Sequence, residues 1–270
     1  DYSMKVLTVS VGISAIPFAA TSLKELVDSA DMAVFQVKRS GKNAIALSSG
    51  GGERGKSTTD MAAEVHKQDI YSGYASTIYA LAAAIDAKDH YTFSHSKNVE
   101  YYASELGYAC GLNDDSVEII REAALLHDIG KIGISENILN KPGRLTQDEF
   151  EIMKSHVENS VGIIRHLPSL DYVIPAVIGH HERYDGTGYP RRISGEDIPL
   201  SARILCIADS FDAMISRRPY KDQYTVFYAK QELQRQAGRQ FDHKLVGLFL
   251  ELLDKGLVIP RERDSQEFGT

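Results

Sequence analysis

The stretch LLHDIGK, from Leu125 to Lys131, is an apolar helical run that ends abruptly on a histidine and an aspartate, His127 and Asp128. Polar groups at the buried end of such a run must be hydrogen-bonded or hold a metal ion, because each stranded polar group costs about 1–3 kcal/mol. Three other stretches help to separate these options, and they contain His95–Ser96, His156, and the run HHERYDGTGYP from His180 to Pro190. Together the four stretches indicate a metal site.

The composition is that of a globular protein of one or two domains, since 43% of the 270 residues are hydrophobic. Cys110 and Cys206 fall in expected helices at unrelated positions, which favours free thiols in a reducing compartment, so we expect a cytoplasmic protein. A membrane span and a secretion signal are not expected in this segment, which begins at Asp1 without an initiator methionine. The formal net charge of −7 argues against DNA or RNA binding through a basic surface.

Residues 1–47 are expected to form a small α/β fragment, with a strand from Val6 to Ile16, a helix from Leu23 to Lys38 and a strand from Ala44 to Leu47. Residues 48–59 are rich in glycine, serine and charge, so they predict a flexible linker. Residues 60–89 follow with helical spacing of their apolar residues, which predicts a connecting helix. This helix could pair with a second copy of itself in a homodimer.

Residues 90–257 are expected to form an all-α domain, followed by a C-terminal tail at 258–270. Asp114 or Asp115 can cap the helix that leads into His127, and Thr146 begins a capping box for the helix that contains His156. Further helices are expected at residues 172–182, 200–216, 226–236 and 243–253.

Gly130 lies just past the helix that ends at the His–Asp pair. A glycine there suits a left-handed helix end. Such an end would place His127, Asp128 and Lys131 at the mouth of a pocket.

The pairs His127–Asp128 and His180–His181 suggest two metal ions side by side. Neighbouring helical residues point about 100° apart, so they cannot chelate one ion as a pair spaced by four residues does. A carboxylate can bridge two ions, and two-metal sites recur in phosphate-ester hydrolysis. Imidazole and carboxylate without thiolate fit Fe, Mn, Zn or Ni better than Mg or Ca.

HDIGK followed by HHERYDGTGYP resembles the HD-GYP family of HD-type phosphohydrolases, and the similarity runs along nearly all of residues 75 to 250. It includes YTFSHS, ILNKPGRLT, ARILCIADSFDA and RPY. The resemblance implies a mainly α fold, an HD-type helical bundle with a metal centre, here preceded by the short α/β fragment. It also implies a phosphodiesterase that hydrolyses a cyclic dinucleotide, with cyclic di-GMP favoured and pGpG and/or GMP as product. Carried over by position, the implied metal ligands are His95, His127, Asp128, His156, His180, His181 and Asp209.

The same resemblance implies a role for each charged residue near these motifs. Asp128 would bridge the metals, a metal-bridging hydroxide would attack, and Lys131 would bind the scissile phosphate. Either water or Asp209 would protonate the leaving oxygen. The remaining substrate-binding residues would be Arg183 and Asp185 on the GYP loop, whose glycines would let backbone approach ligand, and Arg218 and Lys221 at the second phosphate or a base.

The expected cofactor is two divalent metal ions, with Fe or Mn favoured over Zn or Ni. Members of the family with a third metal have a glutamate four residues before the first histidine, where this chain has Tyr91. A phenol is a poor ligand for a hard divalent ion unless it is ionised, and its reference pKa is about 10. Asp212, three residues after Asp209, is expected to support a ligand rather than bind metal.

The first 47 residues resemble the C-terminal end of a GGDEF (diguanylate cyclase) domain, through VGIS and the pattern AD…K…GKN. The signature loop and metal carboxylates of that family would precede Asp1, so no cyclase activity is expected of this segment. Lys38 and Lys42 are interpreted as charges near a helix C-terminus.

Two alternatives remain open from the sequence. One is a hydrolase that prefers another nucleotide, such as the hybrid cyclic GMP-AMP. The other is a catalytically idle cyclic-dinucleotide receptor that passes ligand binding along residues 60–89. The complete ligand set favours an enzyme.

Overall fold

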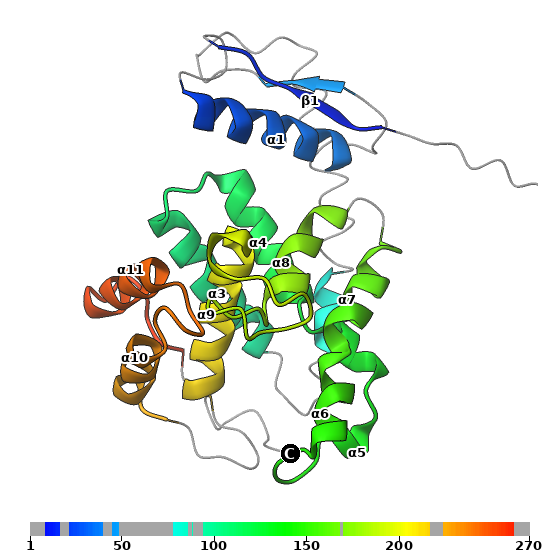
Figure 1. The fold of residues 1–270 in the computed structure, drawn as a ribbon, viewed down its shortest axis with the longest axis vertical. Coiled ribbons are helices and arrows are strands. Elements are labelled where there is room, and N and C mark those ends of the chain that lie inside the picture. The colour runs from blue at the N-terminus through cyan, green and yellow to red at the C-terminus, as the bar shows by residue number, and fades with distance from the viewer. Residues whose placement is uncertain are drawn as a thin grey trace, which may run out of the picture. The chain divides into compact units, whose positions relative to one another are not determined.

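The computed structural model describes residues 9–16, 22–39, 45–48, 78–85, 88, 94–167, 170–216 and 224–261. The chain divides into two compact units (Figure 1), one made of residues 1–76 with 167–172 and the other of residues 77–166 with 173–270. Each unit is described by itself. Among the described residues, no helix combines the length and the apolar character needed to cross a bilayer.

The first unit is a parallel strand pair covered by one helix. Strands β1 (Val11–Ile13) and β2 (Ile45–Leu47) pair in parallel, with Val11 opposite Ile45. Helix α1 (Leu23–Arg39) connects them, as parallel strands require. The side chains of Ala33, Phe35 and Val37 on this helix are buried.

The α/β prediction for this unit is confirmed in its helix and corrected in its first strand. The strand expected from Val6 to Ile16 is three residues long in the described part of the chain, and residues 6–8 lie outside that part. The second strand is also short.

The second unit is a helical bundle. Its helical elements are residues 78–85, α3 (Ser94–Ala109), α4 (Asp114–Leu126), η1 (Ile129–Gly133), α5 (Glu136–Leu139), α6 (Gln147–Lys154), α7 (His156–Ile164), α8 (Ile174–Gly179), η3 (Gly195–Asp197), α9 (Leu200–Ile215), α10 (Val226–Arg235) and α11 (His243–Asp254). A further short helix, η2, spans Asp171–Val173. Helix α9 is the centre of the bundle, since it packs on α3, α8 and α10 (Figure 1).

An aromatic cluster fixes how three of these helices meet. Tyr102 on α3, Phe211 on α9 and Phe249 on α11 are all fully buried. The ring of Phe211 lies edge-on to the other two, with centroid distances of 5.1 Å to each. Such edge-to-face pairs contribute about 0.5–1.5 kcal/mol beyond burial. Because His95 and Asp209 are on these same helices, the cluster also sets the spacing of the site.

Several predicted helix boundaries are confirmed. Thr146 and Glu149 form the expected capping box at the start of α6. Helices α9, α10 and α11 agree with their predicted ranges to within one residue at each end.

Other boundaries were wrong, each for a local reason. Asn113, not Asp114 or Asp115, caps α4 through a hydrogen bond from the Ser116 amide, and the two aspartates lie in the first turn. The single helix expected around His156 is two helices separated at Ser155. The helix expected at residues 172–182 is α8 preceded by η2, and it ends at Gly179. Most of the predicted connecting helix, residues 60–77, lies outside the described residues.

Candidate metal centre and adjoining pocket

Three histidines are oriented by the turn of chain that precedes each of them. The Nδ1 atom of His127 lies 2.7 Å from the Ala124 carbonyl oxygen. The Nδ1 atoms of His156 and His180 lie 2.6 Å from the carbonyls three residues before them. A carbonyl can only accept, so each Nδ1 carries the proton and each Nε2 is left as an electron-pair donor.

The Nε2 atoms of these three histidines are buried, and within the described part of the chain they have no hydrogen-bond partner. Buried polar atoms are normally paired, because leaving one unpaired costs about 1–3 kcal/mol. Three electron-pair donors in one cluster, none with a hydrogen-bond partner among the described residues, are typical of the ligands of a metal site. The residues therefore fit a metal.

His95 is oriented differently, by a carboxylate on another helix. Its Nδ1 lies 2.7 Å from Oδ2 of Asp212 on α9, and its Nε2 lies 3.4 Å from Oδ1 of Asp209. Asp212 is fully buried and also accepts hydrogen bonds from Asn98 at 2.9 Å and Ser216 at 3.0 Å. A carboxylate behind a ligating histidine fixes its tautomer and raises its basicity.

Asp128 lies between two of the helix-end histidines. Its Oδ2 is 3.4 Å from Nε2 of His127, and its Oδ1 is 3.3 Å from Nε2 of His156. The two oxygens thus face different imidazoles, which is the arrangement that a bridging carboxylate needs. Lys131 Nζ also contacts Asp128, at 2.8 Å from Oδ2.

The ligand atoms form three overlapping groups within which all atoms lie within 4.8 Å of one another. We call His95, His127 and Asp209 the carboxylate flank, and His156, His180 and His181 the histidine flank. The third group contains Asp128 with one histidine from each flank, His127 and His180. The structure therefore brings together all seven residues that the sequence predicts as ligands; their role as ligands is a proposal.

The protonation states differ between the two flanks. Burial alone would lower the pKa of His95, but hydrogen bonds to Asp209 and Asp212 outweigh it and raise the pKa to about 10. In the histidine flank, burial and the neighbouring His156 lower the pKa of His181 to about 4. Burial likewise lowers the pKa values of His156 and His180. The histidine flank is therefore neutral and ready to donate electron pairs.

Both carboxylates of the cluster are ionised. Burial would raise the pKa of Asp128, but Lys131 and His127 hold it well below its usual range. The pKa of Asp209 is also lowered, because its hydrogen bond with His95 outweighs the effect of burial. Two ionised carboxylates beside the neutral imidazoles of the histidine flank make a cluster that attracts a divalent cation.

The prediction that Gly130 ends a helix in the left-handed region was wrong. Gly130 lies inside the short helix η1 and is not among the glycines with positive φ. A glycine is needed here because α7 packs closely against this position. A Cβ would lie 1.9 Å from the His156 carbonyl oxygen and 2.4 Å from the Ser160 amide nitrogen. Its amide also donates to Ser160 Oγ, which in turn donates to the His127 carbonyl. Gly130 thus fixes the His–Asp pair against α7.

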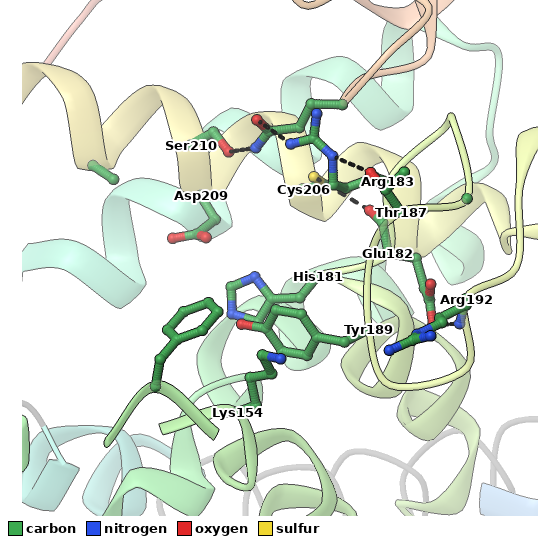
Figure 2. Close-up of a pocket in the computed structure, with 15 residues that line it drawn as sticks. Lys154, His181, Glu182, Arg183, Thr187, Tyr189, Arg192, Cys206, Asp209 and Ser210 are labelled. Atoms are coloured by element: carbon green, nitrogen blue, oxygen red, sulfur yellow. Dashed lines mark hydrogen bonds between the residues drawn. The ribbon is translucent and has the colours of Figure 1, made fainter. Parts of the chain in front are cut away.

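A pocket of about 660 Å³ opens beside the cluster and shares His181 and Asp209 with it (Figure 2). Cavities of roughly 300–1,000 Å³ hold drug-sized ligands. Its walls include aromatic rings and charged side chains, among them Phe150, Lys154, Glu182, Arg183, Tyr189 and Arg192.

The GYP loop that forms one wall is braced by its own side chains. Arg183 donates to Thr187 at 3.0 Å and to Gln240 at 3.0 Å, and lies 3.5 Å from Asp185. Asp185 accepts from both the amide and the hydroxyl of Thr187. The close approach expected of the loop glycines is made to the protein's own chain, because a Cβ on Gly188 would lie 2.3 Å from the Arg183 amide nitrogen.

Three predicted positions lie outside the described residues, namely Tyr91, Arg218 and Lys221. Conversely, the sequence interpretation missed Asn98 and Ser216, whose spacings of three residues from His95 and four from Asp212 put each pair on one helix face. It also missed Glu182 and Arg192, for which the pattern offers no comparable signal.

A helical bundle carrying a largely buried cluster of five histidines and two aspartates has the side chains of a metal-binding domain. The family model described as HD domain matches residues 80–245, so the chain belongs to the HD domain family. Among solved structures, a cyclic GMP-AMP-specific phosphodiesterase of Vibrio cholerae shares the fold with a TM-score of 0.53 and 20% identity, covering 66% of this chain and 48% of that one.

Curated relatives carry cyclic-dinucleotide names. The 3′3′-cGAMP-specific phosphodiesterase 2 of Vibrio cholerae is 42% identical over 67% of this chain and 35% of its own. The cyclic di-GMP phosphodiesterase response regulator RpfG of Xanthomonas campestris is 42% identical over 64% of this chain and 47% of its own. A cyclic di-GMP phosphodiesterase of Thermotoga maritima is 37% identical over 73% of this chain and 56% of its own. The chain thus spans between about a third and just over half of these relatives.

Proposed function

We propose that this protein is a metal-dependent phosphodiesterase that hydrolyses a cyclic dinucleotide. The observation that carries the proposal is the set of three buried, unpartnered histidine Nε2 atoms beside two ionised aspartates, at the edge of a pocket with cationic walls. Phosphodiesterase names among the relatives support the reaction type.

His95, His127, Asp128, His156, His180, His181 and Asp209 would hold two divalent ions, Fe or Mn by preference. When bound, such ions polarise a phosphate oxygen and lower the pKa of a water molecule that they hold. Asp128 would serve both ions, since its two oxygens face different flanks. We propose two ions and not three because Tyr91 stands where family members with a third metal have a glutamate.

The chain's own residues position the substrate and handle charge. The Lys131 ammonium, which pairs with Asp128 at 2.8 Å, would donate to an oxygen of the scissile phosphate. Water and Asp209 are the two candidates for protonating the leaving oxygen, and the hydrogen bond with His95 that lowers the pKa of Asp209 favours water. Arg183 and Asp185 hold the GYP loop in shape. Arg218 and Lys221 keep their proposed role in binding substrate.

Cyclic di-GMP is the proposed substrate, and 3′3′-cGAMP is the second candidate because a relative specific for it is 42% identical. The product would be pGpG and/or GMP. We also propose the domain boundaries predicted from the sequence, a GGDEF-like nature for residues 1–47, a homodimer through residues 60–89, and a cytoplasmic location.

The test is anaerobic purification, metal analysis and turnover of both dinucleotides by Mn- or Fe-loaded protein. We expect two bound metals and cleavage of at least one dinucleotide. His166→Ala is the matched control, since His166 is exposed and belongs to none of the ligand groups. Loaded protein that binds both dinucleotides and cleaves neither would be a receptor, which would contradict the proposal.

A further inference from the structure

Arg192 has a backbone conformation that arginine rarely adopts. Its φ is 57°, and among the described residues no other non-glycine residue has a positive φ. This region is strained for a residue with a Cβ and persists only where the surroundings impose it. Strained residues of this kind cluster at ligand-binding sites.

A buried carboxylate imposes the conformation. Glu182 follows His181 directly and is 2% exposed. Its Oε1 accepts hydrogen bonds from the Arg191 amide at 2.6 Å and the Arg192 amide at 3.1 Å. The loop that carries Arg192 is therefore anchored beside the metal cluster through one side chain.

The Arg192 side chain lines the pocket and makes no hydrogen bond or ion pair within the described ranges, although its charge, like that of Lys154, acts on Glu151 at longer range. The two other cations of the pocket are engaged, because Arg183 bonds to Thr187 and Gln240 and Lys154 pairs with Glu151 at 2.6 Å. In Figure 2, Arg192 and Asp209 lie on opposite sides of the drawn residues, with His181 and Tyr189 between them.

We propose that Arg192 binds the phosphate of the cyclic dinucleotide that is not being cleaved, as a further contact in addition to Arg218 and Lys221, whose proposed role is at that phosphate or at a base. This inference rests on the proposed function. A cyclic dinucleotide carries two phosphodiesters on opposite sides of one ring, so a substrate with one phosphate at the metal cluster directs the other along the pocket. An arginine with free donors matches a phosphate through paired N–H groups. The strained loop holds this arginine, which is exposed to solvent, in the lining of the same pocket and away from Asp209.

The test compares three variants in metal-loaded protein. Arg192→Gly removes the cation and also relieves the strain, so the folded state is not weakened. We expect the KM for cyclic di-GMP to rise about tenfold to a hundredfold, as for a lost hydrogen bond to a charged group, with a smaller change in kcat. Arg192→Lys, which keeps the charge, should recover part of the loss. Arg191→Ala is the matched control, because Arg191 is exposed on the same loop and does not line the pocket.

Three results would overturn the inference: a KM for Arg192→Gly within twofold of the parent protein, an equal rise in Arg191→Ala, or no recovery in Arg192→Lys. The KM for bis(4-nitrophenyl) phosphate, which has one phosphodiester, should rise less than that for cyclic di-GMP. If the parent protein cleaves neither dinucleotide, the proposed function fails, and equilibrium dialysis of cyclic di-GMP still tests Arg192. An unchanged Kd in Arg192→Gly would then contradict its role.

Discussion

The carboxylate flank and the histidine flank of the metal cluster are built from different interactions. In the histidine flank, His156 and His180 are oriented by backbone carbonyls three residues earlier in the same turn. In the carboxylate flank, His95 is oriented by Asp212, which is 117 residues away in sequence. The orientation of His156 and His180 is therefore set by local backbone, whereas that of His95 depends on how α3 packs against α9. A change in the packing of α3 on α9 should disturb the carboxylate flank first.

Removing both His127 and Asp128 should abolish metal binding at both flanks at once. His127 and Asp128 belong to the group that links them, so the double variant His127→Ala with Asp128→Ala should lose both metals. Turnover should fall by on the order of a thousandfold or more, because metal ions supply several kcal/mol of transition-state stabilisation. Metal content by mass spectrometry and dinucleotide turnover measure the effect.

His166→Ala, with its exposed side chain, should keep both metals and full turnover. Circular dichroism establishes whether the double variant is folded. A folded double variant that retains its metals would refute the assigned centre.

Gly130→Ala tests the joint that holds the His–Asp pair against α7. The new Cβ would lie 1.9 Å from the His156 carbonyl oxygen, so η1 and α7 must separate. Overpacking of this kind costs typically 1–3 kcal/mol, and we expect the upper end, about 3 kcal/mol, because the clash is with backbone. Urea unfolding of the metal-free protein measures the loss in free energy of unfolding.

Gly162→Ala is the matched control for this substitution. Gly162 is on the same helix α7, and a Cβ there would meet nothing within 4 Å. Alanine in a helix is favoured over glycine by up to about 1 kcal/mol, so this variant should be as stable as the parent or more stable. Equal stability of the two variants would show that the packing at Gly130 does not hold the pair.

The difference between local interactions and packing of distant segments also explains which features the sequence could predict. The seven proposed ligand positions come from a family resemblance carried by short motifs, and the capping box at Thr146 follows from a local rule. Local rules also describe α9, α10 and α11 well, because each has continuous helical spacing of its apolar residues.

What the sequence could not predict depends on packing between distant segments. A glycine is needed at position 130 because the backbone of α7 leaves no room for a Cβ. The positive φ of Arg192 accompanies a hydrogen bond from its amide to the buried carboxylate of Glu182. The break at Ser155, which makes His156 the first residue of a new helix, interrupts a pattern that reads as one helix. A one-dimensional pattern carries no information on such contacts.

Asp212→Asn should weaken the carboxylate flank alone. Loss of the carboxylate behind His95 typically lowers metal affinity by about 10- to 100-fold. We expect one of two metals to bind more weakly in competition with a chelator, while the other is unaffected. Ser216→Ala removes one of the hydrogen bonds to Asp212 and should give a smaller loss. Equal weakening of both metals by Asp212→Asn would show that the flanks are not independent.

The number of protons released on metal binding should differ between the two flanks, and this is the smallest of the expected effects. In the metal-free protein the pKa of His95 is raised to about 10, so at pH 7.5 it is protonated and a metal must displace that proton. The pKa of His181 is lowered to about 4, so at the same pH it has no proton to release. Protons should therefore compete with a metal at His95 as the pH falls below about 10, whereas they compete at His181 only near pH 4.

Calorimetric metal titrations at pH 7.5, in two buffers of different ionisation enthalpy, count the protons released on metal binding. His95→Ala should lower the count by about one proton, because the imidazole that held it is gone. His181→Ala should leave the count unchanged, although it removes a ligand of the same kind. The chemical difference between the two flanks depends on this difference in the number of protons released. Two variants that lower the count equally would mean that Asp212 and Asp209 do not hold a proton on His95, and the two flanks would then be chemically alike.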